Sequence, residues 1–296
     1  MKINNLLNKR PTLSFEIFPP KNHGDDLSSI FLTISQLAKL NPDFISVTYG
    51  AGGSTSKNTA KIASIIKNQY HIEAVAHLSC IDTSKEDLID ILNELKDNNI
   101  ENILALRGDY PQDYDQRDLQ GDFKYASDLN EFISEQFPNQ FCLSGACYPE
   151  THFEAESFEQ DLQNLKKKVD AGAKYLVTQL FFDNQYYYRL IKRARQIGIN
   201  VPIIAGIMPA TSSKQLKRLS KISDCSIPYS LASMMERFSD DPEACKEVGL
   251  HYATYQIIDL MSQGVDGIHI YTMNKPEIAE EILKRTKAIR REYFKD

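Results

Sequence analysis

The feature of this sequence that most restricts its fold is a repeated alternation of strand-like and helix-like segments. Eight short runs rich in β-branched and other apolar residues recur along the chain, separated by segments with helical periodicity. Most of the runs are almost continuously apolar, as expected for parallel strands that are covered on both faces. The runs are LSFEIF (13–18), DFISVTY (43–49), EAVAHLSC (73–80), NILALRG (102–108), FCLSGACY (141–148), KYLVTQLFF (174–182), VPIIAGIM (201–208) and DGIHIYT (266–272).

Eight strands that alternate with helices predict an α/β fold of the (β/α)₈ type, a TIM barrel, and a doubly wound open sheet is the alternative. The 296 residues suit one such barrel, which typically needs about 250. No repeat, low-complexity tract or linker interrupts the chain, so residues 1–296 are predicted to form a single domain. An extra helix is expected at 228–237, between the seventh strand and the long helix 241–263.

Capping signals predict where several helices begin and end. Thr83-Ser84-Lys85-Glu86 has the pattern of a capping box, and Ser157 with Gln160 has the same pattern. Asp183 or Asn184 is expected to cap the helix that ends at Gly198, and Gly264 is expected to end helix 241–263.

The composition excludes some classes of partner. A formal net charge of −6 argues against nucleic acid, because no basic excess is present to neutralise phosphates. No apolar run approaches the roughly 20 residues of a membrane span.

The five cysteines show no C-x-x-C pair, which favours free thiols in a reducing compartment. The first residues lack the apolar core of a signal peptide, so the protein is expected to be cytoplasmic.

The glycine-rich loop after the second run invites a nucleotide-binding interpretation. Gly50-Ala51-Gly52-Gly53-Ser54-Thr55 places threonine where a dinucleotide fingerprint needs its third glycine, and the P-loop pattern also fails. The loop still follows a strand and opens a helix, so backbone N–H groups point into the site that lies there.

Polar side chains gather where the predicted strands end, which in a barrel is where the chemistry lies. Glu16 is the clearest case: its carboxylate is either paired in the core or partly desolvated with a raised pKa, ready to act as a general acid. No metal is expected, because the histidine, cysteine and acidic residues lack recognised ligand spacings. The serines lack a nucleophile elbow. The other polar residues at these ends are Thr48, Tyr49, His77, Arg107, Asp109, Tyr148, His152, Glu154, Gln179, Tyr271 and Lys275.

Eight segments together resemble the methylenetetrahydrofolate reductases, over roughly residues 12 to 285. The segments are FEIFPPK, FISVTYGAGGS, AHLSCID, ILALRGDYP, CYPETHFEA, LKKKVDAGAKYLVTQLFFD, IIAGIMP and IHIYTMNK, in this order. The chain is similar to the bacterial short form, and the resemblance implies that the C-terminal regulatory domain of the animal enzymes is not expected. The resemblance implies a (β/α)₈ barrel that binds FAD without a dinucleotide fingerprint, with the glycine-rich loop beside the flavin.

The resemblance also implies roles for individual residues. Glu16 matches the catalytic acid, and Asp109 matches the carboxylate that stabilises a cationic folate intermediate. Contacts to the substrate or the nicotinamide are implied at Thr48, Asp109, Gln179, Gln215 and Lys275. Contacts to FAD are implied at Thr48, Tyr49, His77, Arg107, Gly108, Asp109, Tyr125, Ala126, Tyr148, His152, Glu154, Asp161, Asn164, Lys167 and Lys168.

Three positions depart from the enterobacterial pattern. Lys167 and Lys275 stand where those enzymes have arginine, and lysine lacks the bidentate fork of a guanidinium. Leu219 stands where they have a stacking phenylalanine. On the helix predicted at 157–171, Asp161, Asn164 and Lys168 nevertheless lie at i, i+3 and i+7, so they share one face. That face can hold the ribose and pyrophosphate of FAD.

The implied reaction is the reduction of 5,10-methylenetetrahydrofolate to 5-methyltetrahydrofolate by NADH or NADPH, in a ping-pong scheme on bound FAD. A homo-oligomer is expected. Two other classes remain open from the residues alone. One is a lyase or aldolase barrel without a cofactor that uses Glu16 and a rim lysine. The other is a binding barrel without flavin.

Overall fold

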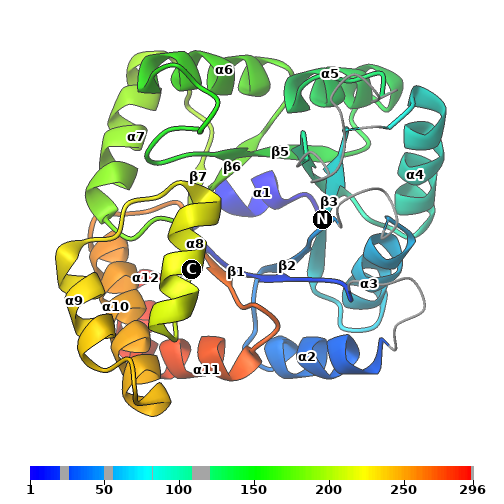
Figure 1. Ribbon diagram of the computed structural model, residues 1–296. Helices are drawn as coiled ribbons and strands as arrows, with labels where there is room; N and C mark the ends of the chain where they lie inside the picture. The colour runs from blue at the N-terminus through cyan, green and yellow to red at the C-terminus, as the bar shows by residue number, and fades with distance from the viewer. Residues whose placement is uncertain (21–26, 50–55, 82, 109–120, 295–296) are drawn as a thin grey trace.

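The protein is a closed barrel of eight parallel strands, paired in sequence order with β1 next to β8. The computed structural model describes residues 1–20, 27–49, 56–81, 83–108 and 121–294. Figure 1 looks along the barrel and shows helices surrounding it. The predicted barrel is therefore confirmed and the open sheet is wrong. The strands are β1 (Thr12–Ile17), β2 (Phe44–Val47), β3 (Glu73–Ser79), β4 (Asn102–Leu106), β5 (Cys142–Cys147), β6 (Tyr175–Thr178), β7 (Ile203–Ile207) and β8 (Gly267–Tyr271).

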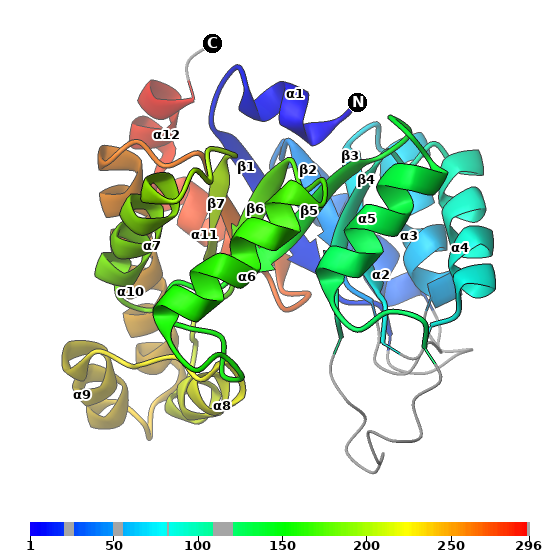
Figure 2. The ribbon, with the colours of Figure 1, turned by 90° about the horizontal axis from the view of Figure 1, so that it is seen from above.

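The helices follow the strands, with additions at both ends of the barrel. The extra helix expected at 228–237 is present as α9, and the structure adds α8 before it; both lie on the side of the C-terminal strand ends (Figure 2). Across the described residues, no helix combines the length and apolar character needed to cross a membrane. The helices are α1 (Ile3–Leu7), α2 (Ser28–Ala38), α3 (Ser56–Asn68), α4 (Lys85–Asp97), α5 (Ala126–Gln136), α6 (Phe158–Asp170), α7 (Asn184–Gln196), α8 (Ser213–Ser223), α9 (Tyr229–Arg237), α10 (Pro242–Ser262), α11 (Pro276–Arg285) and α12 (Lys287–Tyr293).

Side-chain hydrogen bonds fix the helix starts as expected, with one correction. Ser157 Oγ accepts from Gln160 N at 3.1 Å at the start of α6, and Asp183 caps α7. At α4 the predicted capping box is displaced by one residue: Ser84, and not Thr83, is the N-cap and accepts from the backbone N–H of Asp87. The Thr83 hydroxyl instead bonds to backbone carbonyls of the preceding loop.

The strands divide their side chains between two cores. In β1, Leu13, Phe15 and Ile17 point outward and pack in the large cluster formed with the helices. A second, smaller cluster fills the N-terminal half of the barrel interior and includes Ile3 of α1. The other members of that cluster are Phe44, Val75, Leu104, Cys142, Tyr175, Val177 and Ile204.

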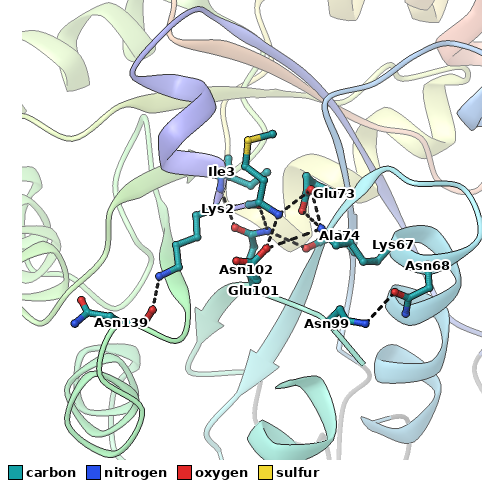
Figure 3. A network of polar contacts seen from close by, with 11 residues as sticks. Lys2, Ile3, Lys67, Asn68, Glu73, Ala74, Asn99, Glu101, Asn102 and Asn139 are labelled. Atoms are coloured by element: carbon teal, nitrogen blue, oxygen red, sulfur yellow. Dashed lines mark hydrogen bonds and ion pairs between the residues drawn. The ribbon is translucent and has the colours of Figure 1, made fainter. Parts of the chain in front are cut away.

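The N-terminal end of the barrel is closed by α1 through a polar network (Figure 3). Asn102 lies at its centre with no solvent exposure. Its Oδ1 accepts from Ile3 N at 2.8 Å, and its Nδ2 donates to Met1 O at 3.1 Å and to Ala74 O at 3.4 Å. Each polar atom of this side chain therefore has a backbone partner, as a buried amide requires.

Candidate active site

Strand register brings a set of polar side chains together inside the opposite half of the barrel. Inward positions alternate with outward ones along a strand, so Ser14 and Glu16 of β1 both face the interior. The register aligns Ser14 with His269 of β8 and Glu16 with Ser46 of β2. His77 of β3 reaches the same place. Closure of the barrel thus places two histidines and two serines around one buried carboxylate.

Glu16 contacts three of these side chains through one oxygen. Its Oε2 lies 3.4 Å from His77 Nε2, 3.5 Å from His269 Nε2 and 3.4 Å from the Ser46 hydroxyl. The Glu16 side chain is only 9% exposed. His77 Nε2 is buried and has no hydrogen-bond partner within the described part of the chain, because its approach to Glu16 lacks hydrogen-bond geometry. An unpartnered buried nitrogen of this kind is ready to bind a ligand atom.

The electrostatics resolve the two options that the sequence left for Glu16. Burial on its own raises the pKa of this carboxyl. The polar contact with His269, the positive charges that His77 and His269 can bear and the Ser46 hydroxyl outweigh it, so the pKa lies below its usual value. Glu16 is therefore paired, and the raised pKa is not found. Burial lowers the pKa of His77 more than the Glu16 charge raises it.

Two neighbouring cavities lie at this end of the barrel, one of them beside this cluster, and the two together are called the cleft below. One has a volume of about 310 Å³ and contains Glu16, and the other has about 300 Å³ and runs along α6. They share five lining residues, so they are adjacent; these are Leu106, Arg107, Ala146, Tyr148 and His152. Each volume lies at the lower end of the range typical of small-molecule sites.

The cavity beside Glu16 collects the predicted residues from several strand ends. These are Glu16, Thr48, Tyr49, His77, Arg107, Gly108, Tyr148, His152 and Gln179. Gly108 has φ +94°, and a Cβ atom there would lie 2.0 Å from Ser79 Oγ. Only glycine fits this backbone, which lines the cavity wall.

The second cavity has a wall of charged and polar side chains. Asp161, Asn164, Lys167 and Lys168 of α6 all line it, with Tyr125 and Ala126 from the start of α5. Lys168 Nζ donates to Ala146 O at 2.6 Å, and burial lowers the pKa of this amino group. The stem of Lys168 crosses Gly145, where a Cβ would lie 2.5 Å from Lys168 Cδ.

Further polar contacts order the loop between β5 and α6. Asp161 Oδ2 accepts from His152 N at 2.9 Å. Glu154 forms a two-point ion pair with Arg107, one arm of which joins Nη2 to Oε1 at 2.9 Å, and the hydrogen bonds from Arg107 lower the pKa of Glu154. This pair bridges the end of β4 to the β5–α6 loop at the junction of the two cavities.

Some predicted residues lie elsewhere. Gln215 of α8 lines neither cavity: its Oε1 accepts from Thr211 N at 2.8 Å and from Thr211 Oγ1 at 2.9 Å. Lys275 precedes α11 and is also absent from both linings. Leu219 packs against the apolar cluster of α8, α9 and α10. Asp109 and the glycine-rich loop at 50–55 lie outside the described residues.

Three residues of the cluster were not predicted from the sequence: Ser14, Ser46 and His269. The available signal was the β1 sequence TLSFEI, in which Thr12, Ser14 and Glu16 alternate with apolar residues although all six are buried. A polar side chain at every inward position indicates a polar barrel interior and calls for partners on the adjacent strands.

Comparison with known proteins identifies the family. The sequence model of methylenetetrahydrofolate reductase matches residues 2–287. The chain belongs to the methylenetetrahydrofolate reductase family. It is 38% identical over 276 residues to 5,10-methylenetetrahydrofolate reductase of Pectobacterium carotovorum, covering 93% of this chain and 90% of that protein. It is 39% identical over 270 residues to the Escherichia coli reductase, covering 91% and 88%.

Longer plant relatives match over part of their length. Methylenetetrahydrofolate reductase (NADH) 1 of Arabidopsis thaliana is 39% identical over 280 residues, which cover 91% of this chain and 47% of that protein. The chain therefore spans about half of this relative. Among solved structures, a Clostridium thermocellum protein described as binding two copies of 5-methyl-5,6,7,8-tetrahydrofolic acid matches with a TM-score of 0.67 at 16% identity, over 97% of this chain and 98% of that one. At this low sequence identity, the match to the Clostridium thermocellum structure shows a shared fold and no more.

Proposed function

We propose that the protein reduces 5,10-methylenetetrahydrofolate to 5-methyltetrahydrofolate, with FAD bound in the cleft and NADH or NADPH as reductant. Family membership supports the reaction, and several relatives are named as NADH enzymes. The observation that carries the proposal is that two cavities adjoin: one holds a buried carboxylate, and the other has lysines, a carboxylate and an amide along one helix face.

The side chains present fit FAD. Lys167 and Lys168 would neutralise the pyrophosphate, and Asp161 and Asn164 would bind ribose hydroxyl groups. The backbone at Gly108 would lie close to the flavin, because no side chain intervenes there. When bound, FAD would take a hydride from the nicotinamide and return it to the folate, which the protein side chains cannot do.

The protein contributes orientation, charge and a proton. The methylene bridge of the folate opens to an electrophilic iminium only after its leaving nitrogen is protonated, and Glu16 is the acid in our proposal. Asp109, by the family resemblance, would stabilise the iminium cation. The nicotinamide and the folate would occupy the cavity beside Glu16 in turn, which gives ping-pong kinetics.

A solved barrel of the same fold is described as binding 5-methyl-5,6,7,8-tetrahydrofolic acid, so a folate ligand is compatible with this fold. The alternative of a lyase without a cofactor needs a rim lysine near Glu16. Lys275, the candidate for that role, does not line the cavity that contains Glu16.

The test is to purify the protein, release its cofactor with acid and identify it by mass spectrometry. We expect FAD, and NAD(P)H-dependent formation of 5-methyltetrahydrofolate. A colourless protein that stays inactive after incubation with FAD would contradict the proposal. If NAD(P)H reduces the flavin but methylenetetrahydrofolate does not reoxidise it, the enzyme must pass its electrons to a different substrate.

A further inference from the structure

The contacts of Glu16 raise a question that the proposed function leaves open. A carboxylate stabilised by hydroxyl and imidazole contacts is ionised in the free protein, yet the reaction needs it to donate a proton. A proton source must therefore lie within reach of its Oε2 atom. Two imidazoles do: His77 Nε2 at 3.4 Å and His269 Nε2 at 3.5 Å.

The two histidines differ in how they are held. His269 has a partner at each ring nitrogen: Ser14 Oγ lies 2.7 Å from Nδ1, and Ser46 Oγ lies 3.3 Å from Nε2. Its ring stacks on Phe44 at a centroid distance of 6.0 Å and meets the edge of Tyr271 at 5.3 Å. His77 has no such fixation at Nε2 in the described residues. His269 is also the more buried ring, with 2% side-chain exposure against 7%.

Ser14 suits both protonation states of His269. In the neutral ring, the Ser14 hydroxyl donates to Nδ1, which leaves the proton on Nε2 facing Glu16. In the imidazolium, Nδ1–H donates to Ser14 Oγ, and the hydroxyl turns to the backbone carbonyl of Ile268, 3.4 Å away. The reverse neutral tautomer would direct the Nε2 lone pair at the carboxylate, which is unfavourable. The surroundings thus accept a change of charge on His269 without a rearrangement.

We infer that His269, held by Ser14, is the positioning residue that supplies Glu16 with the proton used to open the methylene bridge. The imidazolium passes its Nε2 proton to Glu16 Oε2. Glu16 passes it to the leaving nitrogen as the C–N bond breaks and the electron pair stays on that nitrogen. Water returns a proton to His269. One proton is consumed for each folate reduced, because the nitrogen released by C–N cleavage keeps it while the hydride goes to the methylene carbon.

This inference rests on the proposed function and predicts an effect on one half-reaction only. His269→Gln keeps a donor near Glu16 but cannot release a proton at neutral pH. Reduction of the flavin by NAD(P)H should stay within about twofold of wild type, whereas reoxidation by methylenetetrahydrofolate should slow by at least about tenfold. Ser14→Ala, the milder change, should slow the same half-reaction less. His251→Gln, an exposed histidine of α10, is the matched control.

A second readout does not depend on turnover. The ¹⁵N resonances of His269 at alkaline pH should show the tautomer with the proton on Nε2, and Ser14→Ala should reduce that preference. A proton on Nδ1 in the wild type would overturn the inference. So would His269→Gln with wild-type reoxidation, or equal slowing of both half-reactions with a lower melting temperature. A wild-type protein without flavin would instead sink the proposed function.

Discussion

The two ends of the barrel bury polar side chains for different purposes. At the N-terminal end, the Asn102 amide makes hydrogen bonds of 2.8, 3.1 and 3.4 Å to the backbone (Figure 3). At the C-terminal end, the contacts to Glu16 Oε2 are 3.4, 3.4 and 3.5 Å, longer than the usual hydrogen bond. The first network is saturated and stabilises the fold. Within the described residues, the second leaves a nitrogen of His77 without a hydrogen-bond partner beside a cavity, as expected of a site that completes its bonding with a ligand.

The largest effect is expected at the backbone of the C-terminal end. Gly108→Ala would place Cβ 2.0 Å from Ser79 Oγ at a φ of +94°. Strain and overpacking together should cost about 3 kcal/mol of unfolding free energy and reduce the bound flavin. Urea unfolding and flavin content are the measurements.

Gly264→Ala is the control for this substitution, because its φ is +77° but, chain neighbours aside, no atom of the described residues lies within 4 Å of the added Cβ. It should cost only the backbone strain, about 1 kcal/mol. Equal losses in the two variants would show that close packing at Gly108 is unimportant.

At the N-terminal end, stability should change and catalysis should not. Asn102→Ala leaves the Ile3 N–H buried without its acceptor, which should cost about 2 kcal/mol. Urea unfolding measures the loss, and steady-state activity should remain near that of the wild type. Asn93→Ala, on the exposed face of α4, is the control and should be neutral. If Asn102→Ala loses activity without losing stability, the polar network at the N-terminal end is not purely structural.

A smaller effect is expected along the α6 wall. Lys168→Met removes the cation beside Asp161 and should raise the dissociation constant of FAD about tenfold, the scale of one lost charge-assisted hydrogen bond. Lys166→Met is the matched control, because Lys166 pairs with Asp170 and does not line the cavity. Quenching of flavin fluorescence gives both constants. If the two variants weaken FAD equally, the cavity wall has no specific part in binding.

The smallest effect concerns pH. The pKa of His77 is lowered in the folded protein, so as pH falls the unfolded chain takes up a proton at this residue before the folded protein does. Its contribution to stability is complete above the unfolded value of about 6.5 and is lost as pH falls through the folded value. Glu16, also lowered, loses its contribution at more acidic pH, below about 4.5. The difference in unfolding free energy between wild type and His77→Gln should therefore change between pH 7 and pH 5, and a constant difference would contradict this assignment.

The sequence predicted the fold and most of the cleft, because both follow from short-range patterns. Apolar runs separated by amphipathic segments specify strands and helices, and a residue at the end of a parallel strand necessarily faces the C-terminal end of the barrel. Glu16, His77 and Arg107 could be placed by that rule. The Ser14–His269 contact could not, since it joins the first and last strands and depends on the register at which the barrel closes.

The direction of a side chain within a helix or loop could not be predicted from the sequence either. The family resemblance implied a substrate contact at Gln215, but its amide turns back to Thr211, a local hydrogen bond that no pattern in the sequence indicated. The lowered pKa of Glu16 also depends on partners from other strands. The sequence predicted where these residues lie in the barrel, but it did not predict which side chains or backbone groups they contact.

The central claim, that Glu16 is a catalytic acid and not a structural carboxylate, is tested most directly by Glu16→Gln in anaerobic stopped-flow, with the melting temperature measured alongside. Glutamine is nearly isosteric, so folding should be retained. We predict that NAD(P)H reduces the flavin at a near-normal rate and that reoxidation by methylenetetrahydrofolate slows by at least about 10²-fold, the usual scale for a lost general acid. Reoxidation at the wild-type rate, or equal slowing of both half-reactions with a lower melting temperature, would contradict the account.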